Sequence, residues 1–272
     1  KVIQPDDRGK LEHARLRAQR PSRSPLGPGR LMLEEFASSV AFLPHDDRLS
    51  ALERLTDPVK RDQLLGRLGL PGAHGDVTLK ALQYKPERRY VAQVAVSDEP
   101  RALIKVMTGP HYARAREGAR LASKIQAPAP NLLGSISRHG VLAVEWHAGV
   151  TLAAHMHAPA FDPGIGHAVG VTLARLHGSN VKLAKLTSCQ QDSALPGLAA
   201  DLAAILPSGA QLAADLAARV TERLAAADQS SGPIHGDCHP GQFLLTDTGM
   251  AVLDFDRSGA GIPLADLGQF IA

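Results

Sequence analysis

Strand-like segments are confined to one part of this sequence, and that segregation limits the folds that the chain can adopt. Three short segments of alternating or β-branched residues are separated by tight connections at 85–87 and 97–100, which predicts antiparallel strands. A helix follows, and then two further strands joined by a turn. The strands are expected at 77–84, 88–96, 101–107, 132–137 and 140–147, and the helix at 112–126. This part of the chain should therefore form a five-stranded antiparallel sheet with one helix.

The second half of the chain has a different texture, because Ala and Leu recur there at helical spacing. Helices are expected at 151–157, 163–178, 195–206 and 208–228. Two short strands follow at 242–246 and 250–255, joined by a turn at 247–249. Sheet and helices are thus segregated along the chain, which favours an α+β fold. We predict two lobes: a sheet-bearing N-lobe over 76–147 and a mainly helical C-lobe over 148–272.

The first 75 residues form a separate N-terminal extension. Its part from 31 to 70 is expected to be helical, since 31–43 and 61–70 both carry apolar residues at helical spacing. Asp57 followed by Pro58 is typical of a helix start. Residues 18–30 are rich in Pro, Gly and arginine, which predicts a flexible basic arm, either a solvated tail or a phosphate-binding element. The arginines of the first thirty residues include Arg15, Arg17, Arg20, Arg23 and Arg30.

Charge and cysteine content narrow the classes of partner and compartment. The net charge of +3 is too small to indicate nucleic-acid binding by itself. Two cysteines, Cys189 and Cys238, are too few for a disulfide framework or a four-cysteine zinc site. The sequence has no apolar run of about 18 residues, and we recognise no signal peptide. We therefore expect a cytoplasmic protein that binds neither membrane nor nucleic acid.

The strongest chemical pattern lies in the stretch PIHGDCHPGQFLLTDTGMAVLDFDRSG. Asp237 follows His235 at the start of a short loop, and Asp254 ends the second of two short strands. Phosphoryl transfer needs such a pair. One carboxylate orients the acceptor hydroxyl and accepts its proton, and another, with a loop side chain, holds Mg²⁺ on the triphosphate. The alternative is a zinc site built from His235, Cys238 and His239, but no second Cys/His pair stands nearby.

With three earlier motifs, this stretch makes the chain resemble the aminoglycoside phosphotransferase/choline kinase-like family, small-molecule kinases with a protein-kinase-like fold. The motifs, in chain order, are ALIKVM, AREGARLA, VEWHAGVTL, IHGDCHPGQFLL and AVLDFDRSGAGIPLADLGQF. The resemblance covers about residues 76–272. It implies that Asp237 is the catalytic base or the carboxylate that orients the acceptor. It also implies that Asp254 is the main Mg²⁺ ligand, and Asp256 a second ligand or a hydrogen-bond partner.

The resemblance also assigns residues to ATP. Lys105 would hold the α- and β-phosphates and pair with Glu117 on the following helix. The alternatives are a solvated Lys105 on an edge strand and a Glu117 on a solvated helix face. Glu145, Trp146 and His147 would form the hinge that binds adenine, mostly through main-chain groups. Trp146 could equally be a core residue.

Other polar residues are expected to support the site. The resemblance implies that His235 braces the catalytic loop, that Asp266 is a buried carboxylate beneath it, and that His177 is a structural histidine at a helix end. The later helices also carry acidic residues, which either attract a cationic acceptor or lie on solvated faces, the reading we favour. They are Asp201, Asp215, Glu222 and Asp228.

The sequence departs from the family pattern in two places. The family's metal-binding asparagine, five residues after Asp237, is replaced by Gln242, whose carbonyl lies one methylene farther out. Gln242 is therefore a weakened candidate ligand, because Mg²⁺ demands near-octahedral geometry. The turn expected to cover the phosphates, 84–90, has no glycine, so Arg88 or Arg89 would contact phosphate through side chains.

These assignments predict a Mg²⁺-assisted, ATP-dependent kinase that phosphorylates a hydroxyl of a small molecule, such as an antibiotic, a sugar or an amino alcohol. Two alternatives stay open. Gln242 and the glycine-free turn suit a catalytically impaired nucleotide-binding pseudo-kinase. The N-terminal extension could instead dock a protein or a carrier-bound acceptor. The family typically continues beyond the last helix, so we expect the C-lobe to be incomplete.

Overall fold

The chain divides into two compact units, each described here by itself. Unit 1 comprises residues 1–116 and 131–146, and unit 2 comprises residues 117–130 and 147–272. The computed structural model describes residues 8–19, 23–24, 27–70, 76–125, 127–157, 162, 164–181, 191–226 and 231–272. Arg20, Cys189 and Asp228, which the sequence singled out, lie outside these ranges.

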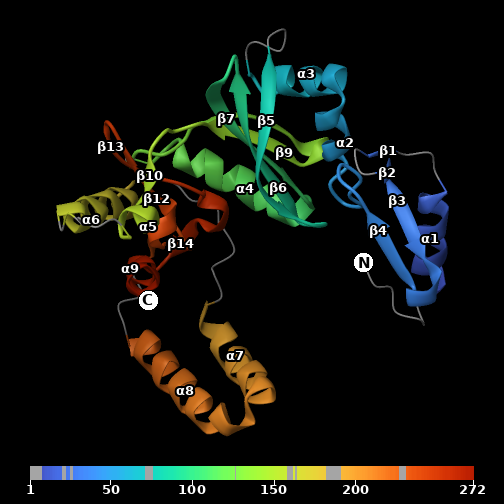
Figure 1. Ribbon diagram of the computed structural model, residues 1–272. Coiled ribbons are helices and arrows are strands. Elements are labelled where there is room, and N and C mark those ends of the chain that lie inside the picture. The colour runs from blue at the N-terminus through green and yellow to red at the C-terminus, as the bar shows by residue number, and fades with distance from the viewer. Residues whose placement is uncertain are drawn as a thin grey trace. The chain divides into compact units, whose positions relative to one another are not determined.

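Unit 1 is built on a five-stranded antiparallel sheet (Figure 1). Its strands are β5 (Val77–Lys85), β6 (Arg89–Val96), β7 (Glu99–Met107), β8 (Leu132–Ile136) and β9 (Val141–Glu145). They lie in the order β5-β6-β7-β9-β8, so β7 is the central strand. Every neighbouring pair is antiparallel, which confirms the predicted sheet. Its inserted helix, α4 (Gly109–Ala122), begins and ends earlier than expected.

The core of unit 1 lies between one face of this sheet and two helices of the N-terminal extension, α2 (Ala51–Thr56) and α3 (Pro58–Arg67). β6 buries Ala92 and Val94, and β7 buries Ile104 and Val106, because side chains at every second strand position share a face. Leu65 of α3 is among the residues packed against them. The extension therefore belongs to the same core as the sheet.

The predicted start of α3 is confirmed by its cap. The Asp57 carboxylate accepts a hydrogen bond from the Lys60 N–H at 3.0 Å, and Pro58 occupies the first turn, where its missing N–H costs nothing. Within the part of unit 1 that the structure describes, α3 also approaches β8 closely. A Cβ added at Gly134 would lie 2.6 Å from the carbonyl oxygen of Leu68, so glycine allows this backbone contact.

The helix predicted at 31–43 is wrong, because this segment forms a β-hairpin. Strands β3 (Arg30–Leu33) and β4 (Ser38–Ala41) pair antiparallel around a single 3₁₀ turn, η1 (Glu34–Phe36). Ala37 adopts the left-handed conformation (φ 42°) that reverses the chain, and Ser38 Oγ donates to the Phe36 carbonyl at 2.8 Å. The apolar residues of this segment also satisfy a period of two, so the helical spacing was ambiguous.

The sequence did not predict the helix α1 (Arg8–Ala18), which leads into the expected basic arm at 18–30. Two short strands, β1 (Arg23–Ser24) and β2 (Gly27–Pro28), pair after it. Ion pairs hold the arginines here: Arg15 contacts Glu34 at 2.8 Å, and both Arg17 and Arg30 contact Asp47. The basic residues thus find carboxylates close by in the same unit.

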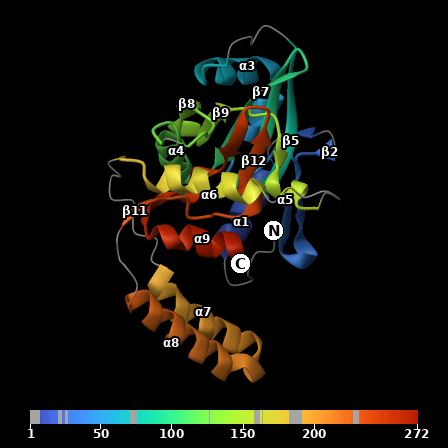
Figure 2. The same cartoon turned by 90° about the vertical axis from the view of Figure 1, so that its left-hand side faces the viewer.

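Unit 2 carries most of the helices. They are α5 (Leu152–His155), α6 (Gly164–His177), α7 (Gln191–Ile205), α8 (Ala210–Ala226) and α9 (Pro263–Ile271), with the 3₁₀ turns η3 (Pro207–Gly209), η4 (Pro240–Gln242) and η5 (Phe255–Arg257). The short strands are β10 (Val150–Thr151), β11 (Gly232–Ile234), β12 (Phe243–Thr246), β13 (Gly249–Val252) and β14 (Gly259–Gly261). Figure 2 shows α7 and α8 packed against each other as a helical hairpin.

The predicted helices and the strand pair of unit 2 are confirmed, with changes at several boundaries. β13 ends at Val252 rather than at 255, because Asp254 has a left-handed backbone (φ 56°) that cannot continue a strand. The core gathers around Phe243 and Val252, which are fully buried, and Leu176 of α6 packs with them. The ring of Phe270 in α9 meets Phe243 edge to face at 5.3 Å.

Among the residues that the structure describes, no helix combines the length and apolar character that crossing a bilayer requires.

Candidate active site

The predicted catalytic loop follows β11, and a buried carboxylate from α9 fixes its backbone. Asp266 is fully buried. Its two oxygens accept hydrogen bonds from the N–H groups of His235 (2.7 Å) and Gly236 (2.9 Å). His177 Nε2, at the end of α6, lies 2.9 Å from the same carboxylate. One side chain therefore joins the loop, α6 and α9, which confirms the supporting roles expected of Asp266 and His177.

Burial and hydrogen bonding act on the pKa of Asp266 in opposite directions. Burial alone would raise it, because a charged group loses its hydration. The hydrogen bonds from His177, His235 and Gly236 favour the ionised form and outweigh burial, so the pKa is lowered. Asp266 is thus a carboxylate at neutral pH, and its charge is matched by donors rather than by solvent.

His235 braces the loop from its other side. Its Nε2 lies 2.7 Å from the carbonyl oxygen of Leu253, and its Nδ1 accepts from the Asp237 N–H at 3.3 Å. These partners assign the ring proton to Nε2. The imidazole also meets the Phe255 ring edge to face, with the ring centres 5.0 Å apart. His235 therefore ties the catalytic loop to the segment that carries Asp254, as expected.

Two neighbours complete the support of the loop. Gly236 has φ 75°, and a Cβ there would lie 2.3 Å from the carbonyl oxygen of Arg257, so this position requires glycine. The N–H of Cys238 donates to Gln269 Oε1 of α9 at 2.9 Å. Burial raises the pKa of the Cys238 thiol to about 12, and the carboxylates of Asp266 and Asp237 add to this shift. Cys238 is therefore a buried, neutral thiol at neutral pH.

Asp237 itself remains accessible. Its side chain is 36% exposed and lies 3.5 Å from Arg257 Nη1, on a side chain that is itself exposed. Such an exposed pair contributes little to stability, because solvent screens it. The backbone of Asp237 is thus fixed by its neighbours, while its carboxylate can reach a ligand.

The three predicted metal ligands lie on the β12–β13 hairpin and the turn that follows it. The Leu253 N–H donates to the Gln242 carbonyl at 2.8 Å, which extends the strand pairing by one step. Gln242 and Asp254 therefore sit at neighbouring points of one hairpin. Asp254 is half-buried, and Asp256 follows in η5. A left-handed backbone at a non-glycine residue marks a position that its surroundings determine closely.

The chemistry of these donors fits Mg²⁺. Asp254, Asp256 and Gln242 offer only hard oxygen atoms, which Mg²⁺ prefers, and the ion needs one or two carboxylates when it also binds phosphates and water. Among the described residues, no group of three or more His, Cys, Asp or Glu side chains is arranged to hold a metal ion. Gln242 would bind a metal ion through an amide oxygen, which is a different type of ligand from these four.

Glu117 and Gly118 of α4 also belong to unit 2, and Gly118 brings the helix against the Asp254 segment. A Cβ at Gly118 would lie 1.9 Å from the carbonyl oxygen of Phe255, so only glycine permits this approach. The Glu117 side chain is 45% exposed and lies 3.8 Å from Arg120, one turn further along the same helix. Gly118 is thus fixed against the Asp254 segment, while the side chain of Glu117 stays accessible to solvent.

In unit 1, Lys105 lies on the central strand β7, opposite Leu142 of β9 and Val91 of β6. It is only 7% exposed. The alternative of a solvated lysine on an edge strand is therefore wrong. Burying an ammonium group is costly unless it has polar partners, so a lysine at this position needs polar contacts to be stable.

The glycine-free turn between β5 and β6 is fastened by a residue that sequence reasoning missed. Asp46 is buried, and its carboxylate accepts hydrogen bonds from the Tyr84 hydroxyl (2.9 Å) and the Glu87 N–H (2.8 Å). It also accepts from the N–H groups of Arg48 and Leu49. Glu87 takes the left-handed conformation (φ 57°) that a glycine would otherwise supply. The N-terminal extension therefore sets the shape of this turn.

The hinge residues make local contacts within their own units. The Glu145 carboxylate accepts from both the N–H (3.1 Å) and the side-chain amide (2.8 Å) of Asn131, where β8 begins. The Trp146 N–H donates to the carbonyl of Arg101 at 3.2 Å. Trp146 and His147 are both half-buried. The side chain of Glu145 thus has a structural role beside any main-chain contact with a ligand.

A family model described as the phosphotransferase enzyme family matches residues 82–272, which is most of the chain. The chain belongs to this family. No curated protein has a significantly similar sequence.

Solved structures of other phosphotransferases have the same fold as this one. A choline/ethanolamine kinase family protein from Mesorhizobium loti is 23% identical, with a TM-score of 0.57 over 77% of this chain and 69% of that one. A macrolide 2′-phosphotransferase from Brachybacterium faecium is 21% identical, with a TM-score of 0.52 over 78% and 76%. An aminoglycoside phosphotransferase in a ternary complex with ADP and hygromycin B is 16% identical, with a TM-score of 0.52 over 76% and 74%. At these identities the likeness establishes the expected protein-kinase-like fold.

The acidic residues considered for acceptor binding in this phosphotransferase lie on the helical hairpin of α7 and α8. Asp201 and Glu222 are exposed, and Asp215 is exposed beside Gln211, whose amide donates to it at 2.9 Å. Their solvated positions agree with the reading that we favoured. They single out no cationic acceptor.

Proposed function

We propose that this protein is an ATP-dependent kinase that transfers the γ-phosphate to a hydroxyl group of a small molecule. The observation that carries the proposal is the anchoring of the Asp237 loop. Asp266 fixes the backbone on one side, His235 ties it to the Asp254 segment on the other, and the Asp237 carboxylate stays accessible. Phosphoryl transfer depends on position and charge more than on covalent chemistry, so a pre-set carboxylate is the part that the protein must supply.

Asp237 is assigned the role of orienting the acceptor. Its carboxylate accepts a hydrogen bond from the acceptor hydroxyl, and then its proton, as the acceptor oxygen bonds to the γ-phosphorus. The bond between that phosphorus and the bridging oxygen breaks at the same time, and ADP carries away the electron pair. Arg257 Nη1 lies 3.5 Å from the Asp237 carboxylate, on a side chain that is itself exposed.

Asp254, Gln242 and Asp256 are assigned to Mg²⁺, which would neutralise charge on the phosphate oxygens when bound. The longer reach of Gln242 is accommodated, in this proposal, by the hairpin backbone that holds it beside Leu253. Lys105, with Glu117, is assigned to the α- and β-phosphates. Main-chain groups of 145–147 are assigned to adenine.

The acceptor is proposed to be a small polyhydroxylated or amino-alcohol compound. The similar structures include, by their names, a choline/ethanolamine kinase family protein and a macrolide phosphotransferase, and one was solved with ADP and hygromycin B. These names support the acceptor class and the use of an adenine nucleotide. We place the reaction in the cytoplasm, where ATP is available.

The proposal is tested first by calorimetric titration with ATP, in the presence and absence of Mg²⁺. Mg²⁺-dependent binding is expected. An acceptor panel of aminoglycosides, macrolides, sugars and amino alcohols is then followed by ADP release. Asp237→Asn should abolish transfer and leave ATP affinity unchanged, whereas Asp247→Asn, on the exposed turn after β12, should behave as the wild type. Normal turnover by Asp237→Asn would refute its role, and no ATP binding at all would refute the kinase.

A nucleotide-binding pseudo-kinase is the second candidate, and Gln242 is the observation that favours it. Gln242→Asn distinguishes the two. Under the kinase proposal, this substitution keeps or raises Mg²⁺-dependent transfer. ATP binding that is indifferent to Mg²⁺, with no transfer by either form, would favour the pseudo-kinase.

A further inference from the structure

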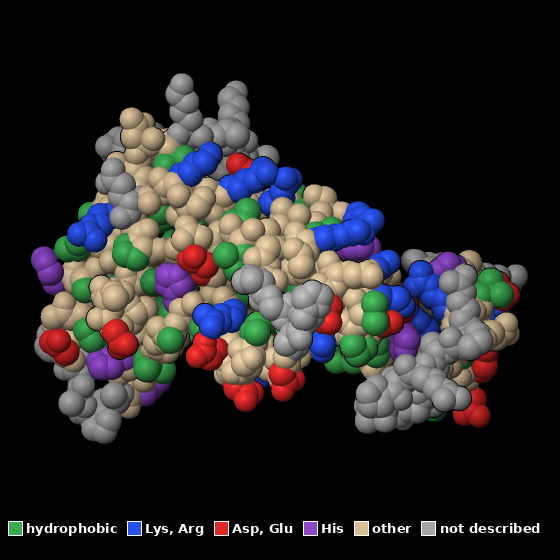
Figure 3. Space-filling model, turned by 90° about the horizontal axis from the view of Figure 1, so that it is seen from above, with side chains coloured by type: hydrophobic (Ala, Val, Ile, Leu, Met, Phe, Trp, Pro, Cys, Tyr) green, Lys and Arg blue, Asp and Glu red, His purple; other side chains and the backbone are tan. Residues whose placement is uncertain are grey.

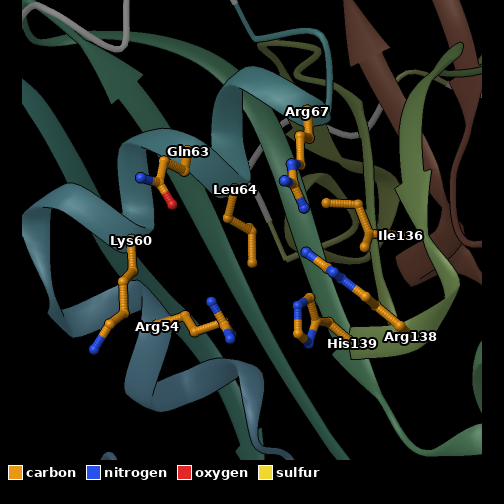
Figure 4. Close-up of a pocket in the computed structure, with 8 residues that line it drawn as sticks. All are labelled: Arg54, Lys60, Gln63, Leu64, Arg67, Ile136, Arg138 and His139. Atoms are coloured by element: carbon orange, nitrogen blue, oxygen red, sulfur yellow. The ribbon is translucent and has the colours of Figure 1, made fainter.

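A basic pocket opens in unit 1, and none of the residues assigned to phosphoryl transfer lines it (Figure 4). It is an open hollow between α2, α3 and the turn η2 (Ser137–His139) that joins β8 to β9. The lining residues are Arg54, Lys60, Gln63, Leu64, Arg67, Ile136, Arg138 and His139. None of them is acidic. Helices α2 and α3 precede the region that the family model matches, so the pocket is partly built by the extension.

Three guanidinium groups converge on this hollow without a counter-charge. In Figure 4, Arg54, Arg67 and Arg138 point toward one another, whereas Lys60 points away. Lys60 pairs with Asp57 at 3.1 Å. Within the described part of the chain, the side chains of the three arginines form no ion pair or hydrogen bond. Like charges placed this close repel one another, which destabilises the folded protein. A bound anion would remove this repulsion.

His139 lies at the base of the same cluster. Its Nε2 is buried and has no hydrogen-bond partner among the described residues, which is unusual for a buried polar atom. Burial lowers the pKa of His139, and the charges of Arg54, Arg138 and Arg67 lower it further. The neutral ring still has one N–H to donate. An anion in the pocket would satisfy a group that the protein leaves unsatisfied.

Close backbone contacts hold both walls in place, so the pocket does not have to form around its ligand. On one side, α3 is fixed to β8 at Gly134, as described above. On the other, a Cβ at Gly140 would lie 2.1 Å from the carbonyl oxygen of Met107, and the Met107 N–H donates to the Gly140 carbonyl at 2.8 Å. Pre-organised donors bind more tightly because less conformational freedom is lost on binding.

We propose that this pocket binds the phosphate group of a small phosphorylated molecule. The planar fork of arginine matches phosphate oxygens with paired hydrogen bonds, and three such forks offer more donors than a carboxylate can accept. The concave shape suits a compact anionic group. A nucleic acid or membrane surface would favour a continuous basic band, but the Lys and Arg side chains on the face seen in Figure 3 form separate small groups.

The test is calorimetric titration of the full chain with pyrophosphate, in EDTA and without ATP, at fixed ionic strength. Saturable binding is expected. Arg67→Gln combined with Arg138→Gln should weaken it roughly a hundredfold, since each lost charge-assisted contact costs about tenfold. Arg48→Gln is the matched control, because Arg48 is exposed in the same extension but does not line the pocket. Lys105→Met, which removes the cation assigned to the ATP phosphates, should leave pyrophosphate binding unchanged, which separates this pocket from the proposed nucleotide site.

Thermal unfolding provides a second reading that does not rely on binding heat. Without anion, the double variant should melt at or above the wild-type temperature, because repulsion has been removed. Pyrophosphate should raise the Tm of the wild type and of Arg48→Gln but not of the double variant. Inorganic phosphate, ADP and glucose 6-phosphate, tested in the same way, identify the source of the phosphate group. Equal affinities in wild type and double variant, or binding of heparin alone, would overturn the proposal.

Discussion

Replacing Asp266 by Asn is the most direct test of how the catalytic loop is held. The carboxylate accepts two main-chain hydrogen bonds, from His235 and Gly236, and a third contact comes from His177. An asparagine oxygen placed at Oδ2 can still meet His235 and His177. Its NH₂ group then faces the Gly236 N–H, so two donors oppose each other in a fully buried site.

The cost follows from this geometry. One hydrogen bond to a charged group is lost outright, worth about 1.5–3 kcal/mol, and the other two lose their charge assistance. We expect a total of roughly 3 kcal/mol for Asp266→Asn. Because each 1.4 kcal/mol corresponds to about a factor of ten, amide exchange of the loop through local opening should accelerate about a hundredfold.

Hydrogen–deuterium exchange of the peptide that contains 234–238 measures this change. Urea unfolding gives the global cost, and Asp247→Asn serves as the control because Asp247 is exposed in unit 2. In a transfer assay, kcat should fall because Asp266 is proposed to position Asp237. The KM for ATP should stay near its wild-type value. Unchanged protection of the loop, together with an unchanged urea midpoint, would show that Asp266 does not support it.

Three further outcomes are expected. The folded pKa of Asp266 lies below its unfolded value of about 3.9, so its contribution is complete at neutral pH and is lost as pH falls through the folded value. The urea midpoints of wild type and Asp266→Asn should therefore converge below about pH 4, and a constant difference would contradict the shift. Gly118→Ala should destabilise by about 1–3 kcal/mol in urea, because its Cβ would meet the Phe255 carbonyl, whereas Gly170→Ala on the open face of α6 should stabilise by up to about 1 kcal/mol. Iodoacetamide at pH 8, followed by peptide mapping, should leave Cys238 unmodified in the native protein and label it after unfolding; rapid native labelling would mean that its thiol is exposed.

Local patterns predicted the sheet and the hairpin of the catalytic region because both depend on period and turn chemistry. The strand carrying Lys105 was recognised from its apolar alternation, and the cap at Asp57 from its own residue type. The segment 31–43 was misread, since its apolar residues fit both a helix and a strand. The left-handed backbone of Ala37 reverses the chain and makes this segment a hairpin. Alanine rarely adopts that conformation, so the sequence does not indicate it.

The other features of the structure could not be predicted, because they depend on contacts between residues far apart in the sequence. Asp46 looked like an ordinary surface residue, because the groups it binds at Tyr84 and Glu87 are about 40 residues away. The basic pocket escaped notice for the same reason, as its arginines come from α2–α3 and from a turn some 70 residues later. Asp266 could be assigned only through its family motif. Nothing in its neighbourhood along the chain indicates that it would be buried.

The anchoring of the loop by Asp266 also has a consequence for synthesis on the ribosome. Asp237 leaves the ribosome 29 residues before Asp266, and at about 5–20 residues per second this gap lasts roughly 1.5 to 6 s. During that time the amides of His235 and Gly236 have no carboxylate to bind, so the nascent loop stays unfixed. A ribosome paused within this interval would hold a nascent chain whose proposed acceptor-orienting loop is not yet fixed. The loop would then become fixed only after α9, which carries Asp266, has emerged.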